Sequence, residues 1–312
     1  MSKYLVTGGC GFIGSNLVKT LVNMGSEVIV VDNLSSGKLI NLPNSKKINF
    51  IEKSIQNVSN SEISDIDGIY HLAAQASVPK SIEKFYESTK NNLLSSIKIF
   101  DIARINKVPV VYASSSAVYG NLELGDENRN NFDIISPYAL DKLTMENYAE
   151  LSFDLFNLSS IGLRFFNVYG PNQDPYNPYS GVITIFINNI INKKPIQVNG
   201  GFQTRDFIFI DDIVKTLIAS LAKQKIKKCF EILNVGTGKS ISINQLLNYL
   251  IDISGYKPEI IKAKLPFGDP EKSAGNYGKL SKILDLEINN FIDFENGLSK
   301  TFHHYKDKLG IK

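Results

Sequence analysis

A tyrosine and a lysine four residues apart, with a run of serines upstream, are the side chains of this sequence best suited to proton transfer. Tyr138 and Lys142 lie in a stretch with helical character, in which residues at positions i and i+4 share one face. An ammonium group beside a phenol favours the phenolate, so we expect Lys142 to lower the pKa of Tyr138 and make it a usable base near neutral pH. Serines 114–116 follow a strand-like segment, and hydroxyls at the carboxyl end of a parallel strand face bound ligands. The run alone does not show which serine takes part.

A glycine-rich turn near the N-terminus is suited to holding a dinucleotide. In the segment TGGCGFIG, residues 7–14, Gly8 permits a tight turn, Gly11 lets the backbone approach a pyrophosphate, and Gly14 lets the next helix pack closely. The N-terminus of that helix offers N–H groups and partial positive charge to the pyrophosphate. Asp32, 18 residues after Gly14, can accept hydrogen bonds from the adenosine ribose and repels a 2′-phosphate. We therefore expect NAD rather than NADP.

The elements that position these residues alternate between strands and helices through the first half of the chain. The expected strands are continuously apolar, as in a parallel sheet buried on both faces, and span residues 4–6, 27–31, 48–51, 68–72, 108–113 and 160–164. The expected helices span residues 14–24, 82–106 and 138–155. This alternation predicts an α/β fold with a doubly wound parallel sheet. After residue 170 the pattern loosens, with a helix expected at 182–192, a strand at 195–199, and a segment at 205–212 that leads into another helix.

Composition excludes several classes of function. The net charge is only +3 and the lysines are scattered, so nucleic acid is not an expected partner. Cys10 and Cys229 form neither a disulfide framework nor a CxxC metal motif, and we expect no bound metal. We find no run long enough for a signal peptide or a membrane span, so we expect a cytoplasmic protein with no membrane partner.

Together these motifs resemble the extended short-chain dehydrogenase/reductase family, and within it the NAD-dependent UDP-sugar 4-epimerases. Further stretches that carry the resemblance are DNLS at 32–35, HLAA at 71–74, SPYALDK at 136–142, LRFFNVYGP at 163–171, TRDF at 204–207 and NVGTG at 234–238. The resemblance implies a Rossmann sheet with a smaller C-terminal α/β substrate lobe. Residues 1–170 would bind NAD with a later contribution from about 205–238, and residues 171–312 would mainly bind the UDP-sugar.

The resemblance also implies roles for individual residues. Counting back from the VYG segment at 118–120 places Ser115 at the family's catalytic hydroxyl, so the implied catalytic residues are Ser115, Tyr138 and Lys142. The implied NAD-binding residues include the tyrosine and lysine of that set and Gly8, Gly11, Phe12, Ile13, Gly14, Asp32, Asn33, Ser35, Ser54, Ile55, Leu72, Ala73, Ala74 and Asn92. The implied substrate-binding residues, besides Ser115 and Tyr138, are Ser77, Val78, Ser116, Asn167, Val198, Asn199, Arg205, Asp269 and Ser273. Among these, Asn167 would bind the sugar-side phosphate, Arg205 the pyrophosphate, and the backbone of 198–199 the uracil.

The reaction implied by the resemblance inverts C4 of the sugar and regenerates NAD in each turnover. Tyr138 takes the proton of the C4 hydroxyl with help from Ser115, while hydride passes to the nicotinamide and Lys142 holds its ribose. The 4-keto sugar then swings about its pyrophosphate and takes hydride back on the opposite face. A homodimer is expected through the helical stretches 82–106 and 138–155, whose apolar residues lie on more than one face.

Three departures from the family pattern concern ligand contacts. Ser54 stands where an Asp usually contacts adenine, and Pro266 stands where an Arg usually reaches the UDP. Residues 75–76, Gln-Ala, replace a lysine that some members place near the nicotinamide ribose.

The residue five positions after the glycine of Gly268-Asp269 gates the pocket beside the sugar C2 substituent in this family, and here it is Ser273. A phenol ring and an N-acetyl group cannot share that space, so a small residue favours UDP-GlcNAc and UDP-GalNAc, with UDP-Glc and UDP-Gal as further substrates. If the register of this loop is displaced, Tyr277 could occupy the gate instead.

Other activities of the same scaffold are less compatible with the sequence. A 4,6-dehydratase needs an Asp-Glu pair, and a decarboxylase a Glu, where residues 116–117 are Ser-Ala. A UDP-glucuronate 4-epimerase usually has Thr in place of Asn167, and this alternative stays open. A non-catalytic NAD-binding sensor protein, the alternative from another class, usually lacks the Tyr/Lys pair that this chain retains.

Overall fold

The computed structural model describes residues 1–128, 131–177, 180–265 and 269–309. The chain forms two compact units, each assembled from three separate stretches. Unit 1 comprises Met1–Val118, Ile134–Arg164 and Val214–Leu233, and unit 2 comprises Tyr119–Asp133, Phe165–Ile213 and Asn234–Lys312. That one part of the chain binds NAD and the other binds the UDP-sugar remains a proposal.

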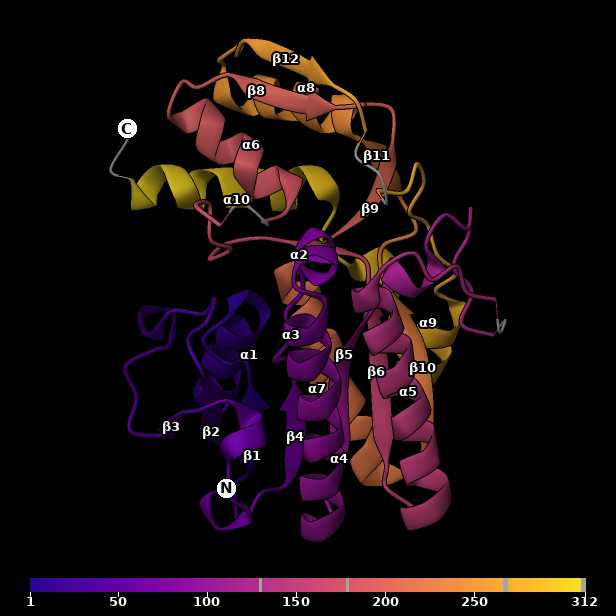
Figure 1. Ribbon diagram of the computed structural model, residues 1–312. Coiled ribbons are helices and arrows are strands. Elements are labelled where there is room, and N and C mark those ends of the chain that lie inside the picture. Colours follow the sequence, from indigo (N-terminus) through magenta and orange to yellow (C-terminus); the bar gives the residue numbers. More distant parts are fainter. Residues whose placement is uncertain (129–130, 178–179, 266–268, 310–312) are drawn as a thin grey trace. The chain divides into compact units, whose positions relative to one another are not determined.

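A seven-stranded sheet forms the centre of unit 1, in the order β3-β2-β1-β4-β5-β6-β10 (Figure 1). Its strands are β1 (Lys3–Thr7), β2 (Glu27–Asp32), β3 (Ile48–Glu52), β4 (Gly68–His71), β5 (Val110–Ser115), β6 (Ser160–Phe165) and β10 (Phe230–Val235). From β3 to β5 each neighbouring pair runs parallel. The strand order reverses between β1 and β4, and in open sheets of this kind ligands bind at the carboxyl ends of the strands where the order reverses. The predicted α/β Rossmann fold is confirmed.

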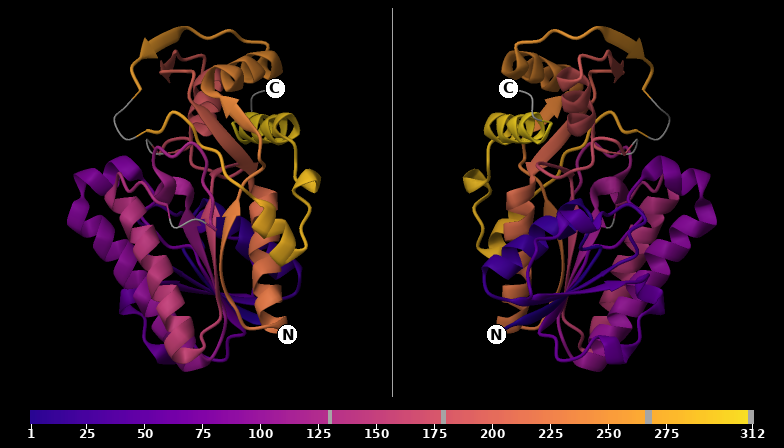
Figure 2. Two further views of the ribbon diagram at one scale, coloured as in Figure 1. Left: turned by 90° about the vertical axis from the view of Figure 1, so that its right-hand side faces the viewer. Right: turned by 90° about the vertical axis from the view of Figure 1, so that its left-hand side faces the viewer.

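Helices cover both faces of this sheet, with α4 and α5 on one side and α1 and α7 on the other (Figure 2). The helices that belong wholly or partly to unit 1 are α1 (Phe12–Asn23), α2 (Val78–Glu83), α3 (Phe85–Thr89), α4 (Ser95–Asn106), α5 (Pro137–Phe156) and α7 (Ile210–Ile226). Short 3-10 turns occur at Leu39–Asn41, Ile55–Asn57, Asn60–Glu62, Ser116–Tyr119 and, in unit 2, Ile288–Asn290.

The prediction of a single helix over 82–106 was wrong. The chain leaves helical geometry at Lys84 (φ −114°, ψ 54°) and passes through a π-helical turn, Lys90–Leu94, before α4 begins. Such turns insert one extra residue and often mark functional sites, because they redirect a side chain. The helix expected at 138–155 is confirmed as α5. It begins where the Ser136 hydroxyl accepts a hydrogen bond from the N–H of Ala139 (3.2 Å), and its C-cap is Asn157 in the left-handed region.

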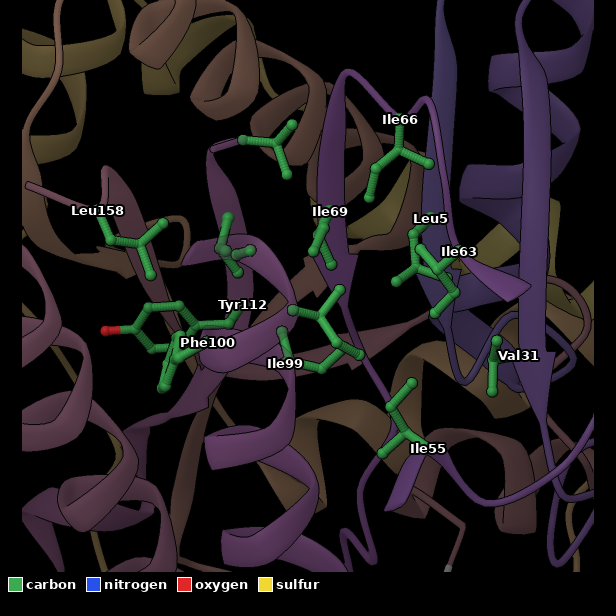
Figure 3. Packing of buried hydrophobic residues seen from close by; sticks show 14 of the residues in the cluster. Leu5, Val31, Ile55, Ile63, Ile66, Ile69, Ile99, Phe100, Tyr112 and Leu158 are labelled. Atoms are coloured by element: carbon green, nitrogen blue, oxygen red, sulfur yellow. The ribbon is translucent and has the colours of Figure 1, made fainter. Parts of the chain in front are cut away.

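The core of unit 1 lies between the central strands and α4 (Figure 3). Leu5, Ile69 and Ile99 are fully buried, which explains why the central strands read as continuous apolar runs. The Tyr112 ring packs edge-on against Phe100, with centroids 5.6 Å apart. This burial fixes the sheet against α4 and thereby holds the strand ends that carry the polar residues of the site.

Unit 2 contains a three-stranded sheet in the order β11-β9-β7 and a parallel pair of β12 and β8. Its strands are β7 (Asn167–Tyr169), β8 (Ile196–Asn199), β9 (Thr204–Phe209), β11 (Ser240–Ser242) and β12 (Ile260–Ala263). Its helices are α6 (Val182–Ile191), α8 (Ile243–Ser254), α9 (Gly278–Leu284) and α10 (Phe294–Lys308). The helix expected at 182–192 and the strand at 195–199 are thus confirmed. Along the described part of the chain, no helix is long and apolar enough to cross a membrane.

Candidate active site

The glycine turn between β1 and α1 is closed so tightly that side chains would not fit at two positions. Gly8 has φ +69°, and a Cβ there would lie 2.7 Å from the backbone nitrogen of Ala73. A Cβ on Gly14 would lie 2.1 Å from the carbonyl oxygen of Gly8. Gly11, the N-cap of α1, carries no capping side chain, and the first turn, which begins with Phe12 and Ile13, has no acidic residue. The first N–H groups of α1 therefore suit an anionic ligand such as a pyrophosphate.

The carboxylate of Asp32 is buried at the end of β2 and holds the backbone on both sides of it. One oxygen accepts a hydrogen bond from the N–H of Cys10 (2.9 Å) and the other from the N–H of Leu34 (2.8 Å). A carboxylate oxygen has two acceptor positions, so each oxygen can take a further hydrogen bond from a ribose hydroxyl. Burial raises the pKa of the Cys10 thiol to about 12, so Cys10 is a packed residue and not a nucleophile.

The residues expected around the adenosine form a second connected group. The Asn33 amide donates to the Ser54 hydroxyl (3.0 Å), and its oxygen accepts from the N–H of Ser35 (3.1 Å). Ile55 follows Ser54 and is buried at the start of a 3-10 turn. The serine that replaces the expected Asp is therefore tied to the loop after β2.

A buried histidine that the sequence analysis did not single out joins the end of β4 to α4. His71 Nδ1 lies 2.8 Å from Thr7 Oγ1, and Nε2 lies 3.0 Å from Ser96 Oγ. The Ser96 hydroxyl donates to the carbonyl of Asn92 (2.7 Å), so it accepts from Nε2–H, and Nδ1 accepts from Thr7. Burial lowers the pKa of His71 to about 3, with the charge of Lys142 contributing. The imidazole is therefore neutral, and only the HLAA pattern pointed to it.

The loop after β4 is fixed by the same network. Leu72 N–H donates to the Thr7 carbonyl (3.1 Å), and Ala73 N–H donates to the Thr7 hydroxyl (3.3 Å), which sets the path of the chain into Ala74. Further along, Ser77 caps α2 by accepting from the N–H of Lys80 (3.2 Å), and Val78 is the first residue of α2.

Asn92 reaches this loop because the π-helical turn points it inward. Its amide oxygen accepts from the N–H of Gln75 (2.8 Å), and its nitrogen donates to the carboxylate of Asp141 on α5 (3.1 Å). Burial raises the pKa of Asp141. Asn92 thus ties the loop at Gln75 to α5.

Tyr138 and Lys142 lie on the buried face of α5, beside the end of β5. The Lys142 ammonium donates to the carbonyl of Ala113 (2.6 Å) and lies 5.7 Å from the centre of the Tyr138 ring. Burial raises the pKa of Tyr138, and a hydrogen bond with the Ser115 hydroxyl opposes that rise. Burial lowers the pKa of Lys142 to about 8. The expectation that the pKa of Tyr138 is lowered was therefore wrong for the protein alone, because desolvation of the phenolate, together with the charge of Asp141, outweighs the effect of Ser115.

The structure distinguishes the three serines that the sequence left equivalent. The Ser114 hydroxyl is buried and donates to Glu146 Oε1. The Ser115 hydroxyl lies close enough to Tyr138 to lower the pKa of its phenol, and it accepts from the N–H of Ala117 (3.1 Å). Ser116 is half-buried and begins the 3-10 turn after β5. Ser115 is thus the serine in contact with the tyrosine, which supports its choice as the catalytic hydroxyl.

In unit 2, two pairs of predicted substrate-binding residues are in direct contact. The Asn167 amide donates to the Ser273 hydroxyl (3.4 Å) and to the carbonyl of Asp206 (3.1 Å). The Arg205 guanidinium forms an ion pair with Asp269 and also donates to the carbonyl of Thr204 (2.8 Å). Val198 is buried in β8 beside β12, and the Asn199 carbonyl accepts from the Gln203 amide (2.6 Å). Pro266 and Gly268 lie outside the described residues.

Tyr277, the alternative gate residue, is held inside unit 2. Its ring is buried against Phe166, and its hydroxyl donates to Asp206 (2.6 Å), whose negative charge adds to the effect of burial in raising the pKa of Tyr277. Asp206 is fully buried and also accepts from the N–H groups of Thr237 and Gly238, which fixes the chain just after β10. Sequence reasoning placed Asp206 in a family motif without a role. Within the described ranges, no group of His, Cys, Asp and Glu could hold a metal ion.

Comparisons with known proteins extend over the whole chain. Residues 4–236 match the NAD dependent epimerase/dehydratase family. A UDP-glucuronate 4-epimerase of Thermodesulfobacterium geofontis is 32% identical over 327 aligned residues, with 100% of this chain and 98% of that protein covered. The structure of a UDP-N-acetylglucosamine 4-epimerase from Methanobrevibacter ruminantium, in complex with UDP-N-acetylmuramic acid, gives a TM-score of 0.92 at 33% identity, covering 98% and 99% of the two chains. That of a UDP-glucose 4-epimerase from Thermotoga maritima, with UDP-glucose, gives 0.90 at 32% identity, with the same coverage.

The buried His71 makes a prediction about stability in acid. Its pKa is about 3 in the folded protein and 6.5 for a free imidazole, so the unfolded chain binds the additional proton between these values. The free energy of unfolding should therefore fall as the pH drops from 6.5 toward 3, by at most about 1.4 kcal/mol per pH unit from this group. Urea unfolding at several pH values checks this, because His71→Asn cannot take up the proton and should have a shallower slope. An unchanged slope in that variant would contradict the assignment.

Proposed function

This chain belongs to the NAD dependent epimerase/dehydratase family and is an NAD-dependent UDP-sugar 4-epimerase, and we propose that its main substrates are UDP-GlcNAc and UDP-GalNAc. UDP-Glc and UDP-Gal are proposed as further substrates. The observation that carries the catalytic assignment is that Tyr138 and Lys142 share the buried face of α5, with the ammonium 5.7 Å from the centre of the phenol ring and bound to the carbonyl of Ala113, two residues before Ser115 on β5.

The residues of unit 1 fit NAD. At Gly8 and Gly14 the turn is too tight for any side chain. The N-terminus of α1 lacks acidic groups, and the Asp32 carboxylate can still accept hydrogen bonds from a ribose. NAD, when bound, supplies a hydride acceptor for C4 of the sugar and a positive charge that favours the Tyr138 phenolate. The added positive charge would lower the pKa of Tyr138, which burial raises in the protein alone.

In the proposed mechanism each side chain has a separate task. The Tyr138 oxygen accepts the proton of the C4 hydroxyl and later returns it, and the Ser115 hydroxyl hydrogen-bonds the same sugar oxygen. Lys142 binds the nicotinamide ribose and keeps the ammonium charge near the phenol. In unit 2, Arg205 is suited to the pyrophosphate because its planar guanidinium matches phosphate oxygens, and its ion pair with Asp269 orients it. Asn167 is proposed to bind the sugar-side phosphate.

Ser273 is the basis for proposing N-acetylated substrates. Its hydroxyl accepts a hydrogen bond from Asn167 (3.4 Å), the residue proposed to bind the phosphate next to the sugar, and this contact supports the proposal. A serine leaves room for an acetamido group at C2, and the one tyrosine nearby in sequence, Tyr277, is held on Asp206. UDP-glucuronate is the second candidate, because one full-length relative is a UDP-glucuronate 4-epimerase, although Asn167 stands where such enzymes usually carry Thr.

We also propose a homodimer through one face of α5 and the neighbouring helices. Four apolar side chains of α5 are 40–63% exposed and follow helical spacing along one face, namely Leu140, Tyr148, Leu151 and Leu155. The stretch from α2 to α4, which packs beside α5, exposes Ile82, Phe85, Tyr86 and Leu94. A second copy would cover both groups, as isologous helix pairs do in dimers.

The catalytic assignment predicts a ranking of three variants. Freshly purified wild type should interconvert UDP-GlcNAc and UDP-GalNAc without added NAD and without accumulating NADH. Tyr138→Phe should reduce kcat by about 10²–10⁴-fold because it removes the proton acceptor, with little change in UDP affinity. Ser115→Ala should reduce kcat more than Ser116→Ala, measured by chromatography of the UDP-sugars. The opposite order of the serine variants would contradict the choice of Ser115.

The gate assignment predicts a change in substrate choice. Ser273→Tyr should abolish turnover of UDP-GlcNAc and retain turnover of UDP-Glc, because the ring fills the space of the acetamido group. Ser273→Ala is the matched control, since it removes the hydroxyl without adding volume and should keep both activities. A wild type that acts only on UDP-Glc and UDP-Gal would overturn the assignment, and preference for UDP-glucuronate would favour the second candidate.

The dimer proposal predicts that charges on α5 separate the subunits. Leu151→Asp combined with Leu155→Asp should halve the mass measured by light scattering after size exclusion, because two carboxylates would be buried without partners. Leu39→Asp, at a residue of similar exposure in another part of unit 1, should leave the mass unchanged. A monomeric wild type would disprove the dimer.

A further inference from the structure

The face of α5 that carries Tyr138 and Lys142 continues one turn further to Glu146. These positions are four residues apart, so they line one side of the helix. Residues 113–115 of β5 lie along this face. The Ala113 carbonyl accepts from Lys142, the Ser114 hydroxyl donates to Glu146, and the Ser115 hydroxyl lies near enough to Tyr138 to lower its pKa. Of the three contacts, the one between Ser114 and Glu146 has no part in the proposed chemistry.

Glu146 is held in a buried ion pair. Arg164 on β6 donates from Nε to Oε1 (2.9 Å) and from Nη2 to Oε2 (2.6 Å), and both side chains are 4% exposed. Such a two-point contact fixes the carboxylate in position and orientation. Burying an ion pair is a weak source of stability, because apolar residues of similar size often serve as well or better. The geometry that the pair imposes is therefore a stronger reason for its presence than its energy.

The fixed carboxylate acts on the strand through Ser114. Its Oε1 accepts the Ser114 hydroxyl together with Arg164 Nε, so the strand residue, α5 and β6 meet at one oxygen. Ser114 is joined to Ser115 by one rigid peptide unit, so a shift of Ser114 moves the hydroxyl that contacts Tyr138. A displacement of about 1 Å in a reacting group can reduce a rate by about 10²-fold.

We propose that Glu146, oriented by Arg164, is a positioning residue that holds Ser114 against α5 and so keeps the Ser115 hydroxyl in contact with Tyr138. The inference rests on the proposed catalytic roles of Ser115 and Tyr138. The contact between Ser114 and Glu146 does not involve the substrate, so losing this contact lowers kcat and leaves KM largely unchanged.

Two variants remove the contact in different ways. Ser114→Ala keeps the ion pair and deletes its link to the strand, and kcat should fall about 10-fold or more by misplacement of Ser115. The double variant Glu146→Leu with Arg164→Met replaces the pair by apolar side chains, which should preserve the melting temperature within a few degrees and still lower kcat. Glu150→Gln, one turn further along α5 at an exposed position, is the matched control and should behave as wild type.

The pH profile of kcat provides a readout that a purely structural role would not change. The groups that act on Tyr138 are the Ser115 hydroxyl from β5, which lowers its pKa, and the Asp141 charge on α5, which raises it, while the Lys142 ammonium lies 5.7 Å from its ring. Weakening the contact with Ser115 should raise the pKa of Tyr138, so the rise of kcat with pH should move to higher pH in Ser114→Ala.

The outcomes separate this inference from the proposed function. An inactive wild type would refute the proposed function, whereas an active wild type with folded variants tests the positioning role alone. Lower kcat with unchanged KM, NAD content and melting temperature, together with the shifted pH profile, would support it. Wild-type kcat in the folded double variant would overturn it. If the double variant does not fold, Ser114→Ala decides, and a wild-type kcat and pH profile there would overturn the proposal.

Discussion

Packing of α5 against the end of β5 is the constraint on which the site in unit 1 depends. The phenol of Tyr138 and the ammonium of Lys142 belong to the helix, whereas the hydroxyl of Ser115 and the carbonyl of Ala113 belong to the strand. Neither element has these groups in useful positions by itself. Buried apolar side chains on α4 and β5 fix this contact within the core. At the carboxyl end of β5, polar contacts such as that between Ser114 and Glu146 fix it. The site therefore draws its geometry from the core.

Burial has a cost that is visible in the ionisable groups. It raises the pKa of Tyr138 and lowers that of Lys142 to about 8, so burial disfavours the charged form of each group, although Lys142 still carries its proton at pH 7. In the mechanism proposed above, proton transfer by Tyr138 would depend on positive charge brought in with the cofactor. Such coupling means that the base becomes effective when NAD is bound, which suits an enzyme whose cofactor is a reagent in every turnover.

Unit 2 is organised around a buried carboxylate in the same way. Asp206 binds the turn at Thr237 and the hydroxyl of Tyr277 through its side chain. Its backbone carbonyl accepts from Asn167, and its N–H donates to the carbonyl of Ser273 (3.2 Å). One residue thus fixes Asn167, Ser273 and Tyr277 relative to one another.

The sequence alone determined the features that depend on local pattern. Continuous apolar runs separated by helical segments specified the parallel sheet, because burial on both faces leaves no polar positions in a strand. Glycine spacing specified the turn before α1, since only glycine fits at positions 8 and 14. The spacing of Tyr138 and Lys142 placed both on one face of α5, because helical geometry is local.

Tertiary structure decided what depends on residues far apart in the chain. It distinguished Ser114, Ser115 and Ser116 by their neighbours on α5, which are Glu146 for Ser114 and Tyr138 for Ser115. It broke the expected helix over 82–106 so that Asn92 could face inward, and it reversed the expected shift in the pKa of Tyr138. These outcomes follow from desolvation and from contacts between distant elements, and neither can be read from spacing along the sequence.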